Sequence, residues 1–339
     1  MTRDINVDHP AVGAAQVFLA GSADALVGAA LLTDRVPYAT WVMIAREHRL
    51  PVLLERPVAE TAREIWCLGY AGTGDDLLPA ALQAHVSHRP VHWLSTTTGR
   101  LSLAAQEVPG LCFESMPGGS LVLLVQRHLQ GSWEPDDYLY ERLGLLLGRS
   151  PGVRPSDPEL ALVNTLHGAA VAVRNNEHLG AGLVRSLAKT SPSCWQQDAT
   201  LQTLCNEGDR LIRAGRTLLM ERMPSRGGRF GPALWVVETG SIARGVHGKA
   251  IATQSYNRQA PAALVERVEA GFTKAWVVLP RQDARLWHHI STTFGQFGKD
   301  FSYTGLRGAG ALPGQAVDEL IELLWDDLNG ASADKPSNY

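Results

Sequence analysis

Short apolar runs alternate with longer helical stretches through the first half of the chain. Runs that end at turn residues predict four buried strands: 17–20, 52–54, 65–69 and a run that begins at 91. The stretches between them predict three helices: 23–33, 38–48 and 77–85, the last after a loop at 71–76. Strands that alternate with helices of this length indicate right-handed βαβ units and a parallel sheet.

Helical patterns dominate the middle of the chain. Ser120 is a predicted N-cap, because it directly precedes a strongly apolar stretch. Four helices are predicted in this region: 121–129, 136–147, 157–187 and 196–223. Ser191, Pro192 and Ser193 interrupt the series, and the sequence Pro-Ser-Arg-Gly-Gly-Arg that follows the last helix predicts a loop between domains.

Strands return in the last third of the chain. The predicted strands are 234–238, 251–253, 274–279 and 286–293, with a helix at 260–270, a glycine-rich loop at 305–311 and a final amphipathic helix at 315–328. The pattern therefore predicts an α/β fold with two domains. Its predicted parts are a parallel-sheet domain at 1–190, a helical linker at 191–229, a smaller α/β domain at 230–329 and a disordered tail at 330–339.

Composition narrows the classes of function only slightly. A net charge of −3 gives no general attraction to nucleic acid or to an anionic membrane, so such binding needs a local basic patch. The four cysteines are far apart and include no CxxC pair, which favours reduced thiols over disulfides or a zinc finger. The N-terminal residues show no signal-peptide h-region and no apolar run reaches membrane-spanning length, so a cytoplasmic location is expected.

The run Val-His-Trp-Leu-Ser-Thr-Thr-Thr-Gly at 91–99 marks the expected ligand site. An apolar strand ends there in hydroxyl residues, and open α/β sheets bind their ligands at the carboxyl ends of the strands. We expect Ser95, Thr96 and Thr97 to stand at the mouth of a cleft. These side chains offer neither a strong base nor a ligand for a hard metal, so the sequence indicates a place more clearly than a reaction.

Three local patterns resemble motifs of the DHH–DHHA1 phosphoesterase superfamily, which includes RecJ-type exonucleases, nanoRNases and cyclic-dinucleotide phosphodiesterases. Residues 18–32, FLAGSADALVGAALL, are similar to the family's first motif, which is a strand, then His-x-Asp-x-Asp, then a helix of small residues. Residues 93–97 lie where the family has Asp-His-His, and the glycine-rich segment at 305–311 is similar to the GGGH-type loop of the second domain. The resemblance covers nearly the whole chain and implies a parallel-sheet DHH-like domain joined to a DHHA1-like domain.

All of these family motifs retain few ligand residues here. In the first motif the family's histidine falls on Ala20, its first aspartate on Ser22 and its second on Asp24. The Asp-His-His falls on Ser95, Thr96 and Thr97. The other expected ligands fall on Cys67 or Leu68, on Arg149 or Ser150, and on Leu306 or Arg307.

These departures bear directly on the chemistry that the resemblance implies. Two divalent metals need several carboxylates and imidazoles, and one aspartate among neutral side chains cannot hold them. We therefore expect a catalytically degenerate protein with no catalytic residue and no metal cofactor. It would bind a nucleotide, a nucleic-acid end or a protein partner in an interdomain cleft, at residues Ser22, Asp24, Ser95, Thr96, Thr97, Arg307 and Gly308.

Two alternatives remain open from the sequence. The first is an active phosphodiesterase or nuclease that binds manganese or magnesium through other ligands: Asp24, Asp75, Asp76 and the histidines near 88. The second is a structural or assembly protein whose cleft has no ligand, which burial of Ser95 and its neighbours would favour. Asp24 also has a purely structural interpretation, as a carboxylate that the helix dipole stabilises at a helix N-terminus.

Other candidate sites are weaker. His88 and His92 have the i, i+4 spacing of a helical metal pair, with His85 nearby, but Pro90 interrupts any helix, so loop or surface histidines are favoured. His288 and His289 are adjacent on a predicted strand and would face opposite sides. The segment 72–76, Gly-Thr-Gly-Asp-Asp, suits an N-cap better than a phosphate, because its two carboxylates would repel one.

Arginines provide the one basic concentration in the sequence. Arg210, Arg213 and Arg216 follow each other at a spacing of three along a predicted helix face. They are candidate phosphate contacts, together with Arg307 in the glycine-rich segment. The alternative is a solvated helix face whose arginines pair with neighbouring carboxylates.

Overall fold

The chain divides into two compact units, which a computed structural model describes separately: unit 1, Met1–Gly208, and unit 2, Asp209–Tyr339. The structure describes residues 15–19, 22–35, 41–44, 64–69, 90–96, 110–116, 119–129, 134, 136–148, 150, 152–176, 178–267, 272–297, 301–304, 306–313 and 317–333. None of their helices is long and apolar enough to cross a lipid bilayer.

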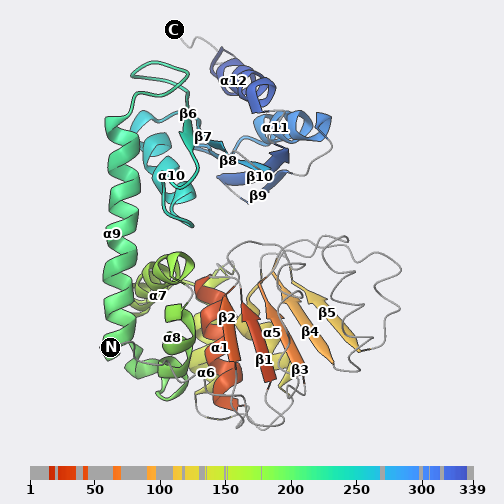
Figure 1. Cartoon of the computed structure of the whole chain (residues 1–339), viewed down its shortest axis with the longest axis vertical. Coiled ribbons are helices and arrows are strands. Elements are labelled where there is room, and N and C mark those ends of the chain that lie inside the picture. Colours follow the sequence, from red (N-terminus) through yellow and green to blue (C-terminus); the bar gives the residue numbers. More distant parts are fainter. Residues whose placement is uncertain are drawn as a thin grey trace, which may run out of the picture. The chain divides into compact units, whose positions relative to one another are not determined.

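Unit 1 contains a five-stranded parallel sheet (Figure 1). Its strands, in sheet order, are β2 (Trp41–Ile44), β1 (Ala15–Leu19), β3 (Glu64–Leu68), β4 (Val91–Ser95) and β5 (Leu111–Ser115). Every pair is parallel, so the carboxyl ends of all five strands lie at one edge. The sheet confirms the predicted α/β class with a parallel first domain.

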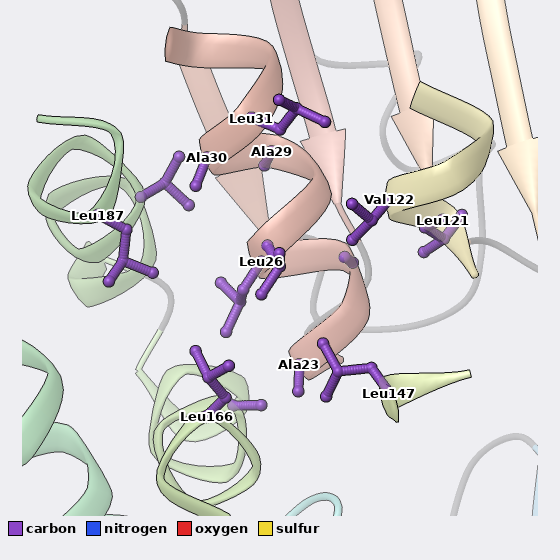
Figure 2. Packing of buried hydrophobic residues seen from close by; sticks show 14 of the residues in the cluster. Ala23, Leu26, Ala29, Ala30, Leu31, Leu121, Val122, Leu147, Leu166 and Leu187 are labelled. Carbon is purple, nitrogen blue, oxygen red and sulfur yellow. The ribbon is translucent and has the colours of Figure 1, made fainter. Parts of the chain in front are cut away.

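Helix α1 (Ala23–Arg35) is the centre of the unit 1 core. Its Ala- and Leu-rich sequence is buried on all sides, as expected for a helix without a polar face. The helices around it are α5 (Leu121–His128), α6 (Asp137–Leu147), α7 (Asp157–Asn175) and α8 (His178–Ala188), followed by the short η1 (Pro192–Gln197). Figure 2 shows side chains of α1 beside the apolar residues Leu121, Val122, Leu147, Leu166 and Leu187.

Unit 2 contains a mixed sheet with helices on both faces (Figure 1). In sheet order its strands are β6 (Ala233–Glu238), β7 (Ala262–Arg267), β8 (Phe272–Val278), β10 (Arg307–Pro313) and β9 (Phe301–Thr304). Only β6 and β7 are parallel. Helix α10 (His247–Arg258) packs against β7 and β8, whereas α11 (Ala284–Gln296) and α12 (Val317–Ala333) form the apolar core of the other face.

Helix α9 (Ala199–Glu221) contains the boundary between the units. The boundary at Gly208 falls inside the segment 191–229 that the sequence assigns to a helical linker. The predicted domain limits at residues 190 and 230 stay predictions. The expected disorder of the tail is wrong for its first residues, because α12 continues through Gly330 to Ala333.

Several sequence predictions in unit 1 need correction. The predicted helix at 38–48 contains strand β2, because Trp41-Val42-Met43-Ile44 pairs with β1 at the sheet edge. The single helix predicted at 157–187 is two helices that separate at Asn176, the C-cap of α7. Strand β5 was not predicted. The elements predicted at 52–54, 71–76 and 77–85 lie outside the described residues.

Four predictions in unit 2 are wrong, and the first three share one reason, a mistaken choice between the periods of helix and strand. The strand at 251–253 is part of α10, and the strand at 286–293 is α11. The helix at 260–270 contains strand β7, whose small apolar residues are buried on both sides. The glycine-rich segment at 305–311 is not a loop before the last helix, because it contains most of strand β10.

Candidate functional site

The carboxyl edge of the unit 1 sheet is where the fold brings the predicted site residues. Strand β4 stays paired with β5 to its last residue, and the Met116 amide donates to the Ser95 carbonyl oxygen at 2.9 Å. Ser95 is completely buried, on the same face of β4 as the buried Val91 and Trp93. The expectation that Ser95 opens into a cleft is therefore wrong, because regular pairing carries its side chain into the interior. Thr96 is partly exposed, and Thr97 is outside the described residues.

Ser22 and Asp24 lie at the N-terminus of α1, beside the same edge. The Ser22 Oγ accepts from the Ala25 amide at 3.1 Å, which is the bond of an N-cap. The Asp24 side chain reaches the start of α5, where its Oδ2 accepts a hydrogen bond from the Leu121 amide at 2.7 Å. Its Oδ1 accepts from the Ser120 hydroxyl at 2.8 Å. Both carboxylate oxygens of Asp24 thus have donors from another helix.

Ser120 completes this junction between the two helices. Its hydroxyl oxygen accepts from the Val122 amide at 3.1 Å, so the predicted N-cap of α5 is confirmed. Asp24 adds negative charge where the amide groups of α5 carry partial positive charge. Its partly buried carboxyl nevertheless has a pKa raised to about 6, because loss of solvent outweighs the lowering effect of the hydrogen bonds from Leu121 and Ser120 and of the nearby Val122 amide.

These side chains do not fit a pair of hard divalent metals. Manganese and magnesium prefer several oxygen ligands, above all carboxylates. Among the described family positions, Asp24 is the only carboxylate, and both of its oxygens already serve α5. Ser22 is a helix cap, and Cys67, Leu68 and Ser95 are buried. Ala20, Thr97 and Arg149 lie outside the part of the chain that the structure describes.

The other candidate metal ligands predicted from the sequence, histidines and the Asp75–Asp76 pair, lie partly outside the described residues and partly on a helix. His85, His88 and the segment 72–76 with Asp75 and Asp76 lie outside the described residues. His288 and His289 lie on helix α11 rather than on the predicted strand, so their side chains do not alternate between the faces of a sheet. Both are exposed to solvent, and their ring centroids are 6.2 Å apart.

The predicted phosphate-binding arginines all lie in unit 2 and are exposed. Arg210, Arg213 and Arg216 occupy α9, as predicted. Arg307 begins strand β10, where it pairs with Val278 of β8, so it is on a sheet rather than in a loop. Gly308 has a packing role, because a Cβ there would lie 2.4 Å from the Phe301 ring.

A second group of polar side chains lies on the unit 1 sheet, toward the amino ends of its strands. His92 of β4 and Cys112 of β5 are register partners, and His128 is the last residue of α5. One ring nitrogen of each histidine and the Cys112 Sγ all lie within 4.8 Å of one another. Within the described ranges, no other group of three or more His, Cys, Asp or Glu residues has this property.

Carboxylates border this His92–Cys112–His128 group on both sides. The His92 Nε2 lies 3.5 Å from Glu64 Oε2, and the contact with His92 is the main cause of a lowered pKa at Glu64. The His128 Nε2 lies 2.8 Å from Glu114 Oε2. The pKa of the Cys112 thiol is raised, first by partial burial and then by the charge of Glu114. The sequence pointed to His92 as a candidate ligand but not to its partners, because the isolated Cys112 has the pattern of an ordinary reduced thiol.

Comparisons with known proteins identify the fold. No family model matches the sequence, and no curated protein matches it either. Among solved structures, RecJ from Thermus thermophilus in complex with Mn²⁺ has a TM-score of 0.60 at 12% identity and matches 96% of this chain. This chain covers only 53% of that RecJ chain.

Two further structures match over most of their own length. PggH, a pGpG-specific phosphodiesterase from Vibrio cholerae, has a TM-score of 0.52 at 13% identity, covering 93% of this chain and 99% of that one. The DHH domain of a protein assigned to a ribosomal-protein family has a TM-score of 0.56 at 12% identity, covering 92% and 85%. The chain therefore has the fold of these DHH-family structures, as the resemblance predicted. Identities this low show the fold and not the activity.

Proposed function

We propose that this chain is a catalytically degenerate protein of phosphoesterase-like fold, which binds phosphate-bearing ligands without hydrolysing them. The observation that carries the proposal is the position of Asp24. Its carboxylate is the single ligand-type residue kept at the family's first motif, and it caps helix α5 instead of facing an open site. A carboxylate with both oxygens committed to a helix N-terminus is poorly placed to hold a metal.

The expected ligand class follows from the neighbours and from the exposed arginines. PggH is a pGpG-specific phosphodiesterase and RecJ is an exonuclease, so both neighbours act on phosphodiesters. Unit 2 presents Arg210, Arg213, Arg216 and Arg307 to solvent. Guanidinium groups bind phosphate oxygens through paired hydrogen bonds and keep their charge at any physiological pH. We propose a nucleotide or the end of a single strand as the ligand, with manganese and magnesium playing no part.

Metal-dependent hydrolysis should be absent. Purified protein incubated with pGpG or a labelled short oligonucleotide, with manganese or magnesium, is expected to release no product above a protein-free control, because most of the family's ligand positions hold residues that cannot bind a metal pair. Chromatography of the reaction at several times provides the measurement. Turnover that requires metal and disappears in Asp24→Ala protein, with folding preserved, would contradict the proposal and restore the enzyme alternative.

Binding should depend on Arg307 and on salt. Hydrogen bonds to charged groups contribute roughly 1.5–3 kcal/mol each, so Arg307→Ala should weaken binding about tenfold or more. Fluorescence anisotropy of a labelled oligonucleotide at several salt concentrations measures the affinity, which should fall as salt rises because phosphate contacts release counterions. Arg281→Ala is the matched control, since it also removes one exposed positive charge from unit 2.

The control separates a local contact from general electrostatics. Equal weakening by Arg307→Ala and Arg281→Ala would assign the effect to net charge alone and remove Arg307 from the site. No binding at low salt would favour the second candidate function, a structural or assembly protein with a protein partner. The complete burial of Ser95 is the observation that favours this second candidate.

A further inference from the structure

We propose that His92, Cys112 and His128 bind one zinc ion on unit 1. One thiolate and two imidazoles are ligands that zinc takes in proteins, with a tetrahedral arrangement and bonds of about 2.0–2.3 Å. Such bonds place neighbouring ligand atoms roughly 3.5 Å apart. One nitrogen of each imidazole and the Cys112 Sγ already lie within 4.8 Å of one another, so small side-chain adjustments bring three ligands onto one ion. This site is independent of the proposed phosphate binding.

The parallel register assembles the site from segments that are distant in the sequence. His92 pairs with Cys112 on one side and with Trp66 on the other, so the three side chains are neighbours on one face of the sheet. The Trp66 ring stacks on the His92 ring with centroids 4.2 Å apart and an angle of 21°, which limits rotation of the imidazole. His128 reaches the same place from the carboxyl end of α5, where the helix dipole favours a cation.

Glu64 and Glu114 hold the two imidazoles as carboxylates do at metal sites. Histidine ligands usually donate their second ring N–H to a carboxylate, which fixes the tautomer and makes the other nitrogen a better ligand. Here the Nε2 atoms face the carboxylates, at 3.5 Å for His92 and 2.8 Å for His128. This leaves Nδ1 of each ring for a metal. The His92 Nδ1 is buried and has no hydrogen-bond partner among the described residues, a costly state that a metal bond would relieve.

The donor types select zinc over the metals bound by RecJ. Manganese and magnesium prefer oxygen ligands, whereas sulfur and imidazole nitrogen suit zinc. The charge of Glu64 offsets part of the charge of the ion, whereas that of Glu114 is shared with Arg127. All three ligand residues are partly exposed, so an ion can enter from solvent. Three protein ligands leave the fourth position for water or for a small ligand.

Cobalt titration tests the site directly, because Co²⁺ replaces zinc in tetrahedral sites and reports thiolate coordination by an intense near-ultraviolet band. Chelator-treated full-length protein is expected to gain this band with one Co²⁺ per chain and to lose it when Zn²⁺ is added. Zinc should also raise the thermal unfolding midpoint, since an ion that binds only the folded state stabilises it. Replacing a direct ligand in Cys112→Ser or His128→Gln should weaken cobalt and zinc binding by at least about 100-fold.

Cys194→Ser is the matched control, because Cys194 is exposed on η1 and belongs to no such group among the described residues. It should bind as the wild type does. Far-ultraviolet circular dichroism checks that each variant is folded, and having two ligand variants keeps the test valid if one of them fails to fold. Absence of the thiolate–cobalt band in the wild type, or equal binding by the wild type and a folded Cys112→Ser protein, would overturn the proposal.

Discussion

Replacing Gly208 with alanine should lower the free energy of unfolding by about 2–3 kcal/mol, the upper part of the usual range for overpacked positions. Gly208 lies on α9, where its missing side chain lets the backbone of α7 approach. A Cβ at Gly208 would lie 1.9 Å from the carbonyl oxygen of Gly168 and 2.6 Å from its carbonyl carbon. These are backbone atoms, so no rotamer change relieves the overlap and the two helices must separate.

Gly182→Ala is the control for this prediction. Gly182 is also inside a helix, α8, but a Cβ there would meet no atom within 4 Å. The change should therefore stabilise the protein by up to about 1 kcal/mol, through the higher helix propensity of alanine. Urea unfolding followed by circular dichroism measures both variants. If Gly208→Ala were as stable as Gly182→Ala, the close crossing of α7 and α9 would be refuted.

The elements of unit 1 were largely predictable, because buried parallel strands leave short apolar runs. Ile65–Leu68 and Val91–Leu94 are such runs, and both end at residues that stop a strand. Strand β5 was missed because its five residues, Leu-Cys-Phe-Glu-Ser, are all only partly buried and include a charge. A partly covered strand at the end of a sheet has no continuous apolar signal.

The elements of unit 2 were harder to predict, because its helices and strands have similar apolar content. The signals for α11 were present in the sequence: Leu286, Trp287, Ile290 and Phe294 follow a helical period, and Asp283 caps the helix through the Leu286 amide at 2.9 Å. Strand β7 follows Pro261, a residue that is tolerated before a strand.

The sites were only partly predictable, since they depend on contacts between distant segments. The sequence could indicate that Asp24 lies at a helix N-terminus, but not that its carboxylate caps a second helix 97 residues later at Leu121. Nor could it give the register that places His92 beside Cys112. Strand register in a parallel sheet is set by packing and by crossover connections, which one sequence does not reveal.

Asp24→Asn should remove a pH dependence of stability. The pKa of Asp24 is raised from its ordinary value of 3.8 to about 6 in the folded protein, mainly by burial. The folded state therefore keeps the proton more strongly than the unfolded state does. Asp24 therefore makes its full contribution to stability below its ordinary pKa of 3.8, and this contribution is lost as pH rises through the folded-state pKa of about 6. Asparagine keeps a carbonyl oxygen for the Leu121 amide but cannot ionise.

The difference in unfolding free energy between Asp24→Asn and the wild type should thus shift by about 2 kcal/mol in favour of the variant between about pH 4.5 and pH 7.5. Taking the difference between the two proteins cancels the pH-dependent contributions of the other titrating groups, because both proteins share them. Glu159, whose pKa is lowered to about 2 chiefly by its bond to Arg142, titrates below this window in both proteins. Urea unfolding at several pH values gives the two curves. Parallel curves would mean that Asp24 faces water, and a shift of opposite sign would mean that cationic groups or donors hold it ionised, as they would in a working metal site.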